Sequence, residues 1–210
     1  MTTDDPLPDR PAPDNPSGKL VLLRHGETEW SKQGRHTGLT DIPLTANGEA
    51  QARRLGERLR GRKFARVLTS PLQRAARTCA IAGFGDRSEI EPDLVEWNYG
   101  DYEGVRTHDI LKGRPGWQLF RDGCPGGESP AEAGARADRV IARLRGIDGD
   151  VLLFSSGHFT RVLAARWLGL PPGAGTHFIL GTATLSVLGY EHDMNEPVIQ
   201  LWNDSRHLEG

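Results

Sequence analysis

Residues 19–26, KLVLLRHG, decide the fold class of this 210-residue chain. Four consecutive apolar residues, Leu20 to Leu23, lie between two charged ones, which is typical of a short strand buried on both faces of a sheet. A strand of that kind needs helices on both of its sides. The segment therefore predicts a central strand of an α/β sheet, ended by Gly26.

The rest of the chain alternates short apolar runs with helical patterns, which is the signature of an α/β sheet. Further strands are expected at 66–71 and 150–158, the second of them feeding a helix at 159–172. Two late strands, 182–192 and 198–204, are candidates for neighbours in the sheet. The sequence has no internal repeat and no second linker, so this pattern predicts one α/β domain.

Capping residues mark three expected helix starts. Thr45 precedes a helical pattern and is its candidate N-cap. Ser70 followed by Pro71 predicts an N-cap with proline at the first helical position. Ser129 and Glu132 have the spacing of a capping box, which predicts the start of the third helix.

Composition divides the chain into a tail and a body. Residues 1–18 hold five prolines, four aspartates and one arginine with almost nothing apolar, so we expect a disordered tail. The tail carries a formal charge of -3 and residues 19–210, the predicted domain, carry +1, which gives the total of -2. This balance excludes a nucleic-acid-binding module that works by bulk positive charge.

The sequence also carries signals about location. It has no run of about 18 apolar residues, and its N-terminus is acidic and proline-rich where a signal peptide would be basic and then apolar. Cys79 and Cys124 stand 45 residues apart without a CxxC pattern, as reduced thiols would. We therefore expect a soluble cytoplasmic protein with neither membrane nor nucleic acid as a partner.

Three of the expected strands end in polar residues that do not belong to the strand pattern. These residues are Arg24, His25 and Gly26, then Ser70 with Arg74, then Ser155, Ser156, Gly157 and His158. Ligands of an open α/β sheet bind at the carboxyl ends of its strands, so the three tips should converge on one site. Arg24 and Arg74 can bind phosphoryl oxygens bidentately, and Arg74 is expected one turn into a helix, whose N-terminus favours an anion. The tips therefore predict a phosphate site.

His25 is the candidate nucleophile of that site. A neutral imidazole can attack phosphorus and hold the group as phosphohistidine, and the neighbouring Arg24 would be costly to bury without an anion. Glu96 is a candidate proton donor, because its apolar neighbours in the sequence would favour the protonated acid. Glu103, which stands before a glycine, is a rival for the same role.

Several segments, taken in order, resemble the histidine phosphatase superfamily with its phosphoglycerate-mutase-like fold. They are LVLLRHGETEW, TGLTDIPLTANGEAQA, VLTSPLQRAARTC, LVEWNYGDYEG and SSGHFTRVLAARWLG, within residues 19–202. The chain is most similar to the branch of small phosphatases like sedoheptulose-1,7-bisphosphatase and the broad-specificity acid phosphatases. The resemblance implies a three-layer α/β/α sandwich with a mostly parallel central sheet.

The resemblance also implies roles for individual residues. His25 would be phosphorylated, Arg24 and Arg74 would hold the phosphoryl oxygens, and Glu96 would protonate the leaving group. Family positions that line the substrate pocket fall on Ser31, Thr37, Gly38 and Tyr99. The family chemistry implies no cofactor and no metal.

One position departs from the family pattern. A second histidine usually stands just before the glycine, where this chain has Ser156, and the nearby histidine is His158. Ser156 can donate one hydrogen bond to a phosphoryl oxygen but brings no positive charge. Three outcomes stay open: His158 reaches into the gap, the phosphate cradle is weaker than usual, or catalysis is lost.

The expected activity is a phosphomonoesterase that acts on a small phosphorylated metabolite, a sugar phosphate or bisphosphate. Only 24 residues separate Gly104 from Ser129, which leaves little room for the cap that a mutase would need to exclude water. Candidate contacts to a second phosphate are Lys32, Arg35, His36 and Arg106.

Three alternatives to this activity remain. The first is a cofactor-dependent phosphoglycerate mutase, and the second is a catalytically impaired phosphate-binding relative, as the serine at position 156 would allow. The third is a metal-dependent hydrolase with His25, His158 and Glu96 as ligands, although the adjacent arginines disfavour a cation.

Overall fold

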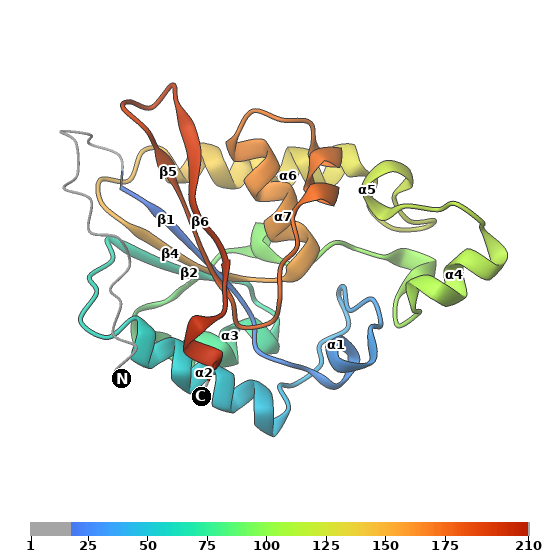
Figure 1. The fold of residues 1–210 in the computed structure, drawn as a ribbon, viewed down its shortest axis with the longest axis horizontal. Coiled ribbons are helices and arrows are strands. Elements are labelled where there is room, and N and C mark those ends of the chain that lie inside the picture. The colour runs from blue at the N-terminus through green and yellow to red at the C-terminus, as the bar shows by residue number, and fades with distance from the viewer. Residues whose placement is uncertain (1–17, 210) are drawn as a thin grey trace.

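The computed structural model describes residues 18–209 and is built around one six-stranded sheet with the order β3-β2-β4-β1-β5-β6 (Figure 1). β1, β2, β3 and β4 are parallel, whereas β5 is antiparallel to both of its neighbours. The strands are β1 (Leu20–Arg24), β2 (Arg66–Thr69), β3 (Glu89–Ile90), β4 (Val151–Ser155), β5 (Leu185–Tyr190) and β6 (Pro197–Asp204). The two late strands are neighbours, as the sequence suggested.

Helices cover both faces of this sheet, with α6 and α7 on one side and α2 and α3 on the other (Figure 1). The helices are α1 (Glu29–Gln33), α2 (Ala46–Arg58), α3 (Gln73–Ile81), α4 (Thr107–Gly113), α5 (Leu119–Asp122), α6 (Pro130–Leu144) and α7 (Gly157–Trp167). Short 3-10 segments are η1 (Gly85–Arg87), η2 (Pro92–Leu94), η3 (Gly100–Tyr102), η4 (Pro172–His177) and η5 (Arg206–Leu208). The expected three-layer α/β/α sandwich with a mostly parallel sheet is confirmed.

The apolar run of β1 is explained by its central position. Leu20 and Leu22 pack into the core under α6 and α7, whereas Val21 and Leu23 pack into the core over α2 and α3. All four side chains are at most 2% exposed, because successive residues of a strand point to opposite faces. The two cores together therefore need β1 to be apolar at each position from Leu20 to Leu23.

Two of the three expected helix starts are confirmed. The Thr45 hydroxyl accepts the N–H of Gly48 at 3.0 Å at the start of α2. Ser129 and Glu132 form the capping box of α6, with each side chain bound to the other residue's main chain. These caps satisfy N–H groups that a helix terminus leaves without a partner.

The third expected helix start is wrong. α3 begins at Gln73, and the Ser70 hydroxyl instead accepts the Leu72 N–H in a turn before the helix. The Asp41 carboxylate accepts the Gln73 N–H at 2.8 Å, so a distant loop supplies the acceptor that a serine cap would have provided. Arg74 is consequently the second residue of α3 and not one turn inside it.

Residues 1–17, almost all of the tail expected at 1–18, lie outside the described residues. Among residues 18–209, none of the helices combines the length and apolar character needed to cross a membrane.

Candidate phosphate site

A cavity of about 180 Å³ opens where β1 and β4 end. It is lined by Arg24, His25, Ser31, Gly34, Arg35, His36, Thr37, Glu96, Tyr99, Thr107, Gly157, His158, Arg161 and Leu180. The parallel register of β1 and β4 pairs Arg24 with Ser155, which brings the tip of β1 beside the first turn of α7. The tips of β1 and β4 therefore meet at one cavity, whereas Ser70 and Arg74, which follow β2, do not line it.

His25 is buried, and one of its ring nitrogens has no hydrogen-bond partner within residues 18–209. Its Nδ1 lies 2.8 Å from the carbonyl oxygen of Gly26. A carbonyl only accepts hydrogen bonds, so Nδ1 carries the proton and Nε2 has a lone pair. Burial and the charges of Arg74 and Arg24 hold the pKa of His25 well below its usual 6.5. The ring is therefore neutral at physiological pH, which is the form that can act as a nucleophile.

We expect an NMR titration of the imidazole rings to separate two histidines. The His25 signal should remain that of the neutral ring below pH 6.5, because burial and two arginines lower the pKa of His25. The exposed His192 should have its titration midpoint above pH 6.5, because its hydrogen bond to Glu196 raises its pKa. The spectrum of His25→Ala identifies the His25 signal. A His25 midpoint at or above 6.5 would contradict the neutral nucleophile.

Arg24 lies against the first turn of α7, and one of its N–H groups has no acceptor among the described residues. One terminal nitrogen donates to the Leu180 carbonyl, while Nε has no partner among residues 18–209. A Cβ at position 157 would lie 3.2 Å from the Cζ and Nε of Arg24, so Gly157 gives the guanidinium room. A buried cation with an unsatisfied N–H is arranged to receive an anion.

Arg74 is held by a ring of carbonyl groups beside the cavity. It is fully buried, and its terminal nitrogens donate to the carbonyls of Thr37, Gly38 and Thr40 at 2.7–3.0 Å. Its Nε has no partner among the described residues. The Glu103 carboxylate in turn accepts the N–H groups of Gly38 and Thr40. Glu103 therefore fixes the loop around Arg74. Because its carboxylate already binds two N–H groups and Glu103 does not line the cavity, it is disfavoured as the proton donor.

Glu96 is bound to main-chain N–H groups, so the apolar setting expected from its sequence neighbours is wrong. Its Oε1 accepts the N–H of Trp97 at 2.9 Å and of Phe159 at 2.7 Å. Its Oε2 accepts a single N–H among residues 18–209, that of His158 at 3.0 Å. The carboxyl group thus caps α7, and Oε2 has capacity left to carry and donate a proton at the cavity wall.

Ser156 occupies the N-cap position of α7 without capping it. An N-cap hydroxyl would normally accept the N–H of Phe159, but Glu96 accepts that group. The Ser156 hydroxyl is fully buried and has no partner among residues 18–209. Together with the Nε atoms of Arg24 and Arg74, it belongs to a set of unsatisfied buried donors around the site.

His158 lines the cavity but brings no positive charge to it. Its Nδ1 lies 2.5 Å from the Tyr99 hydroxyl, and its ring stacks on His36 at 6.0 Å between centroids. Burial and the charge of Arg161 hold the pKa of His158 well below 6.5. His158 is consequently neutral and cannot replace the charge of a second histidine.

Some of the other expected residues line the cavity and some do not. Ser31, Thr37 and Tyr99 line the cavity, but Gly38, Arg74 and Ser156 do not. Of the residues expected for a second phosphate, Arg35 and His36 line the cavity, whereas Lys32 and Arg106 do not.

Arg161 lines the cavity but was not predicted from the sequence. Its guanidinium lies 4.4 Å from the ring centroid of Phe120. Arg161 follows His158 by three residues on α7, and this helical spacing is the signal that could have identified it.

Within residues 18–209, no three His, Cys, Asp or Glu side chains form a group that could hold a metal ion. His25, His158 and Glu96 share the cavity without forming such a set.

Comparisons with known proteins agree with this geometry. A family model described as the histidine phosphatase superfamily (branch 1) matches residues 20–205. The chain is 41% identical over 182 residues to an acid phosphatase of Mycobacterium tuberculosis, covering 85% of this chain and 89% of that protein. It is 38% identical over 185 residues to sedoheptulose 1,7-bisphosphatase of Saccharomyces cerevisiae, covering 72% of this chain and 68% of that protein.

A solved structure gives the same result. The structure of the open reading frame Rv3214 product of Mycobacterium tuberculosis matches with a TM-score of 0.83 and 38% identity. The match covers 89% of this chain and 97% of that one. The chain therefore belongs to the histidine phosphatase superfamily and is a phosphoric monoester hydrolase.

Proposed function

We propose that the protein hydrolyses sugar phosphates or similar small phosphate esters through a phosphohistidine on His25. The observation that carries the proposal is the contact between Nδ1 of His25 and the Gly26 carbonyl, which holds the ring proton on Nδ1 and leaves the lone pair on Nε2. Burial and positive neighbours keep the ring neutral, and a neutral imidazole is the reactive form.

In the first half-reaction, Nε2 of His25 attacks phosphorus and the bond from phosphorus to the ester oxygen breaks. The unsatisfied N–H groups of Arg24 and Arg74 and the Ser156 hydroxyl stabilise the charge on the phosphoryl oxygens. Glu96 gives its proton to the departing alcohol oxygen. The products of this step are a free alcohol, an ionised Glu96 and a phosphorylated His25.

In the second half-reaction, water replaces the alcohol. Glu96, now ionised, takes a proton from the water as its oxygen attacks phosphorus. The bond from phosphorus to Nε2 breaks, and the electron pair returns to His25. Inorganic phosphate leaves, and both residues are restored for another cycle.

The substrate class is supported by the rest of the cavity lining. Arg35 and Arg161 border the cavity, as do the hydroxyl groups of Ser31, Thr37 and Tyr99. Hydroxyl groups and arginines are suited to a polyhydroxylated ester with a second anionic group. A relative, the yeast sedoheptulose 1,7-bisphosphatase, bears the name of such a substrate.

The test is incubation with a panel of sugar phosphates, sugar bisphosphates and phosphoglycerates, following both free phosphate and isomer formation. We expect free phosphate from one or more of the sugar esters. Isomerised phosphoglycerate with little free phosphate would instead identify a mutase. Activity should survive a chelator, and its loss on chelation would contradict the metal-free mechanism.

We expect Glu96→Gln to slow hydrolysis of sugar phosphates by about 10²-fold, because the alkoxide then leaves without a proton. p-Nitrophenyl phosphate should be much less affected, since nitrophenolate is stable as an anion. We compare kcat/KM for both esters, which reports the first half-reaction and not the later attack of water, on protein whose thermal unfolding matches the parent. Equal losses with the two esters would contradict the assignment of Glu96 as proton donor.

A second candidate function is phosphate binding with little turnover, and the observation that favours it is Ser156. The serine brings no positive charge to the site, and the neutral His158 does not supply that charge. Tight binding of inorganic phosphate without hydrolysis of any ester in the panel would support this function.

A further inference from the structure

Arg136 is a buried arginine of α6 that does not line the cavity, although it contacts the loop that carries Glu96. Only 6% of the residue is exposed. One terminal nitrogen donates to the carbonyls of Asp93 at 2.9 Å and Val95 at 2.6 Å, and the other to the carbonyl of Glu96 at 3.3 Å. A single side chain thus binds three carbonyls in the four residues that end at Glu96.

Glu128 orients the guanidinium and binds the other end of the loop. Its two carboxylate oxygens accept from Nε and a terminal nitrogen of Arg136 at 2.9 and 2.8 Å. One of them also accepts the Asn98 N–H at 2.8 Å, and the Glu128 carbonyl accepts the Trp97 indole N–H at 3.0 Å. The ion pair therefore holds the main chain on both sides of Glu96.

Arg136 also touches the group that binds the Glu96 carboxylate. Its Cζ lies 4.2 Å from the ring centroid of Phe159. The N–H of Phe159 donates to Oε1 of Glu96 at 2.7 Å. The same guanidinium therefore supports the main chain of Glu96 and the helix turn that holds its side chain.

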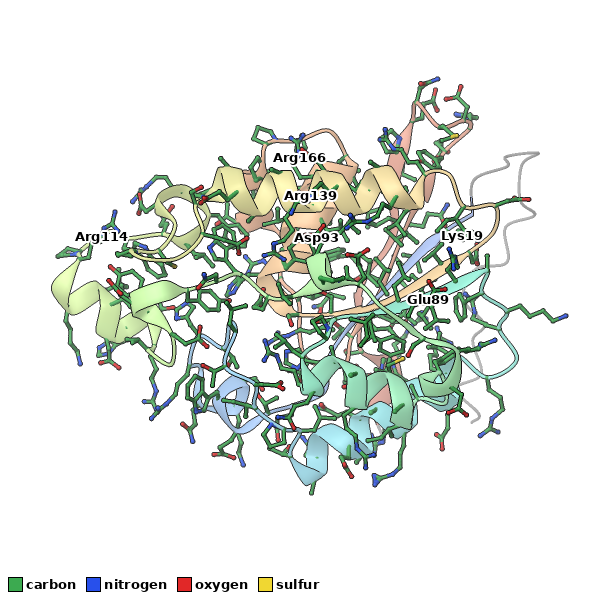
Figure 2. The ribbon with its side chains drawn as sticks, turned by 180° about the vertical axis from the view of Figure 1, so that it is seen from behind. Lys19, Glu89, Asp93, Arg114, Arg139 and Arg166 are labelled. Carbon is green, nitrogen blue, oxygen red and sulfur yellow. The ribbon has the colours of Figure 1, made fainter. Side chains whose placement is uncertain are left out.

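The exposed arginines of α6 offer a contrast. Arg139 pairs with the Asp93 carboxylate at 2.8 and 3.1 Å, and Figure 2 shows these two residues together on the outer surface. The Arg139 side chain is 55% exposed, and an exposed ion pair of this kind contributes little. Arg139 contacts the side chain of Asp93 at the start of the loop, whereas Arg136 holds the main chain that leads to the carboxyl group of Glu96.

We propose that Arg136, with Glu128, is a positioning residue that fixes the Glu96 carboxyl for proton transfer to the leaving group. The inference rests on the proposed function, since it needs Glu96 to be the proton donor. A planar guanidinium can serve three carbonyls and a carboxylate at once, and an ammonium group cannot. Lysine at this position would keep the buried charge beside Glu128 but would release part of the loop.

The experiment compares Arg136→Lys with Arg139→Lys on two esters, glycerol phosphate and p-nitrophenyl phosphate. Arg136→Lys should lower kcat/KM, which reports the first half-reaction, by about tenfold for glycerol phosphate, as displaced catalytic groups do, and by less than about twofold for the nitrophenyl ester. Arg139→Lys should leave both rates within about twofold of the parent. Adding Arg136→Lys to Glu96→Gln should not increase the selectivity beyond that of Glu96→Gln alone.

The outcomes separate the inference from the function on which it rests. Equal losses with both esters in Arg136→Lys, or the same selectivity in Arg139→Lys, would overturn the inference while a selective Glu96→Gln left the function intact. Additive selectivity in the double variant would also overturn it. If the parent turned over neither ester, or Glu96→Gln showed no selectivity, the proposed mechanism and the inference would both fail.

Discussion

Replacing His25 by alanine is expected to lower ester hydrolysis by on the order of 10⁴–10⁶, the loss typical of a missing nucleophile or its base. Alanine removes the only atom proposed to bond with phosphorus, while the arginines around it remain. Phosphate release gives the rate. Rapid quenching with labelled substrate should trap an acid-labile phosphoprotein in the parent and none in the variant.

The matched control is His192→Ala, because His192 is exposed and pairs with Glu196 on the surface. That variant should hydrolyse esters and become labelled like the parent. His25→Ala should still bind inorganic phosphate, which would show that the cradle is folded. A variant that hydrolyses esters as fast as the parent would refute the phosphohistidine mechanism.

Ser156→His is expected to raise the hydrolysis rate by about 10²–10³, the range measured when one donor to transition-state charge is removed elsewhere. The hydroxyl at this position supplies one hydrogen bond and no charge. An imidazole beside the phosphoryl group could become protonated and stabilise the growing charge. The helix should tolerate the change, because the α7 cap comes from Glu96 and not from Ser156.

Ser156→Ala is the control for this gain. It removes the hydroxyl and should slow hydrolysis further, because the phosphoryl group loses a donor. Thermal unfolding and phosphate binding are measured for both variants, since the serine is fully buried and the larger ring must find room. A folded Ser156→His protein that binds phosphate but gains no rate would show that the missing charge does not limit this enzyme.

The sequence was sufficient for the parts of the fold that follow from local patterns. Residues Leu20 to Leu23 had to be buried on two sides, which placed β1 at the sheet centre. The polar residues after β1 and β4 then had to lie at one sheet edge, because parallel strands end on the same side. Arg24, His25 and His158 could be placed together for this reason.

Features that depend on partners distant in the sequence could not be predicted. The start of α3 depends on Asp41, 32 residues before Gln73, and no local signal indicates that contact. The surroundings of Glu96 depend on the α7 N-terminus, 61 residues later, so apolar neighbours in the sequence gave the wrong environment. Such errors arise because a loop can place a side chain against any element that it crosses.

The carbonyl ring around Arg74 has a further consequence for the enzyme. Its guanidinium is fixed by three main-chain oxygens, so its direction is set before any ester arrives. Little rearrangement is then required at the moment of reaction. The same rigidity suits the cradle to inorganic phosphate as well as to the ester. The released phosphate therefore competes with the next substrate for the site.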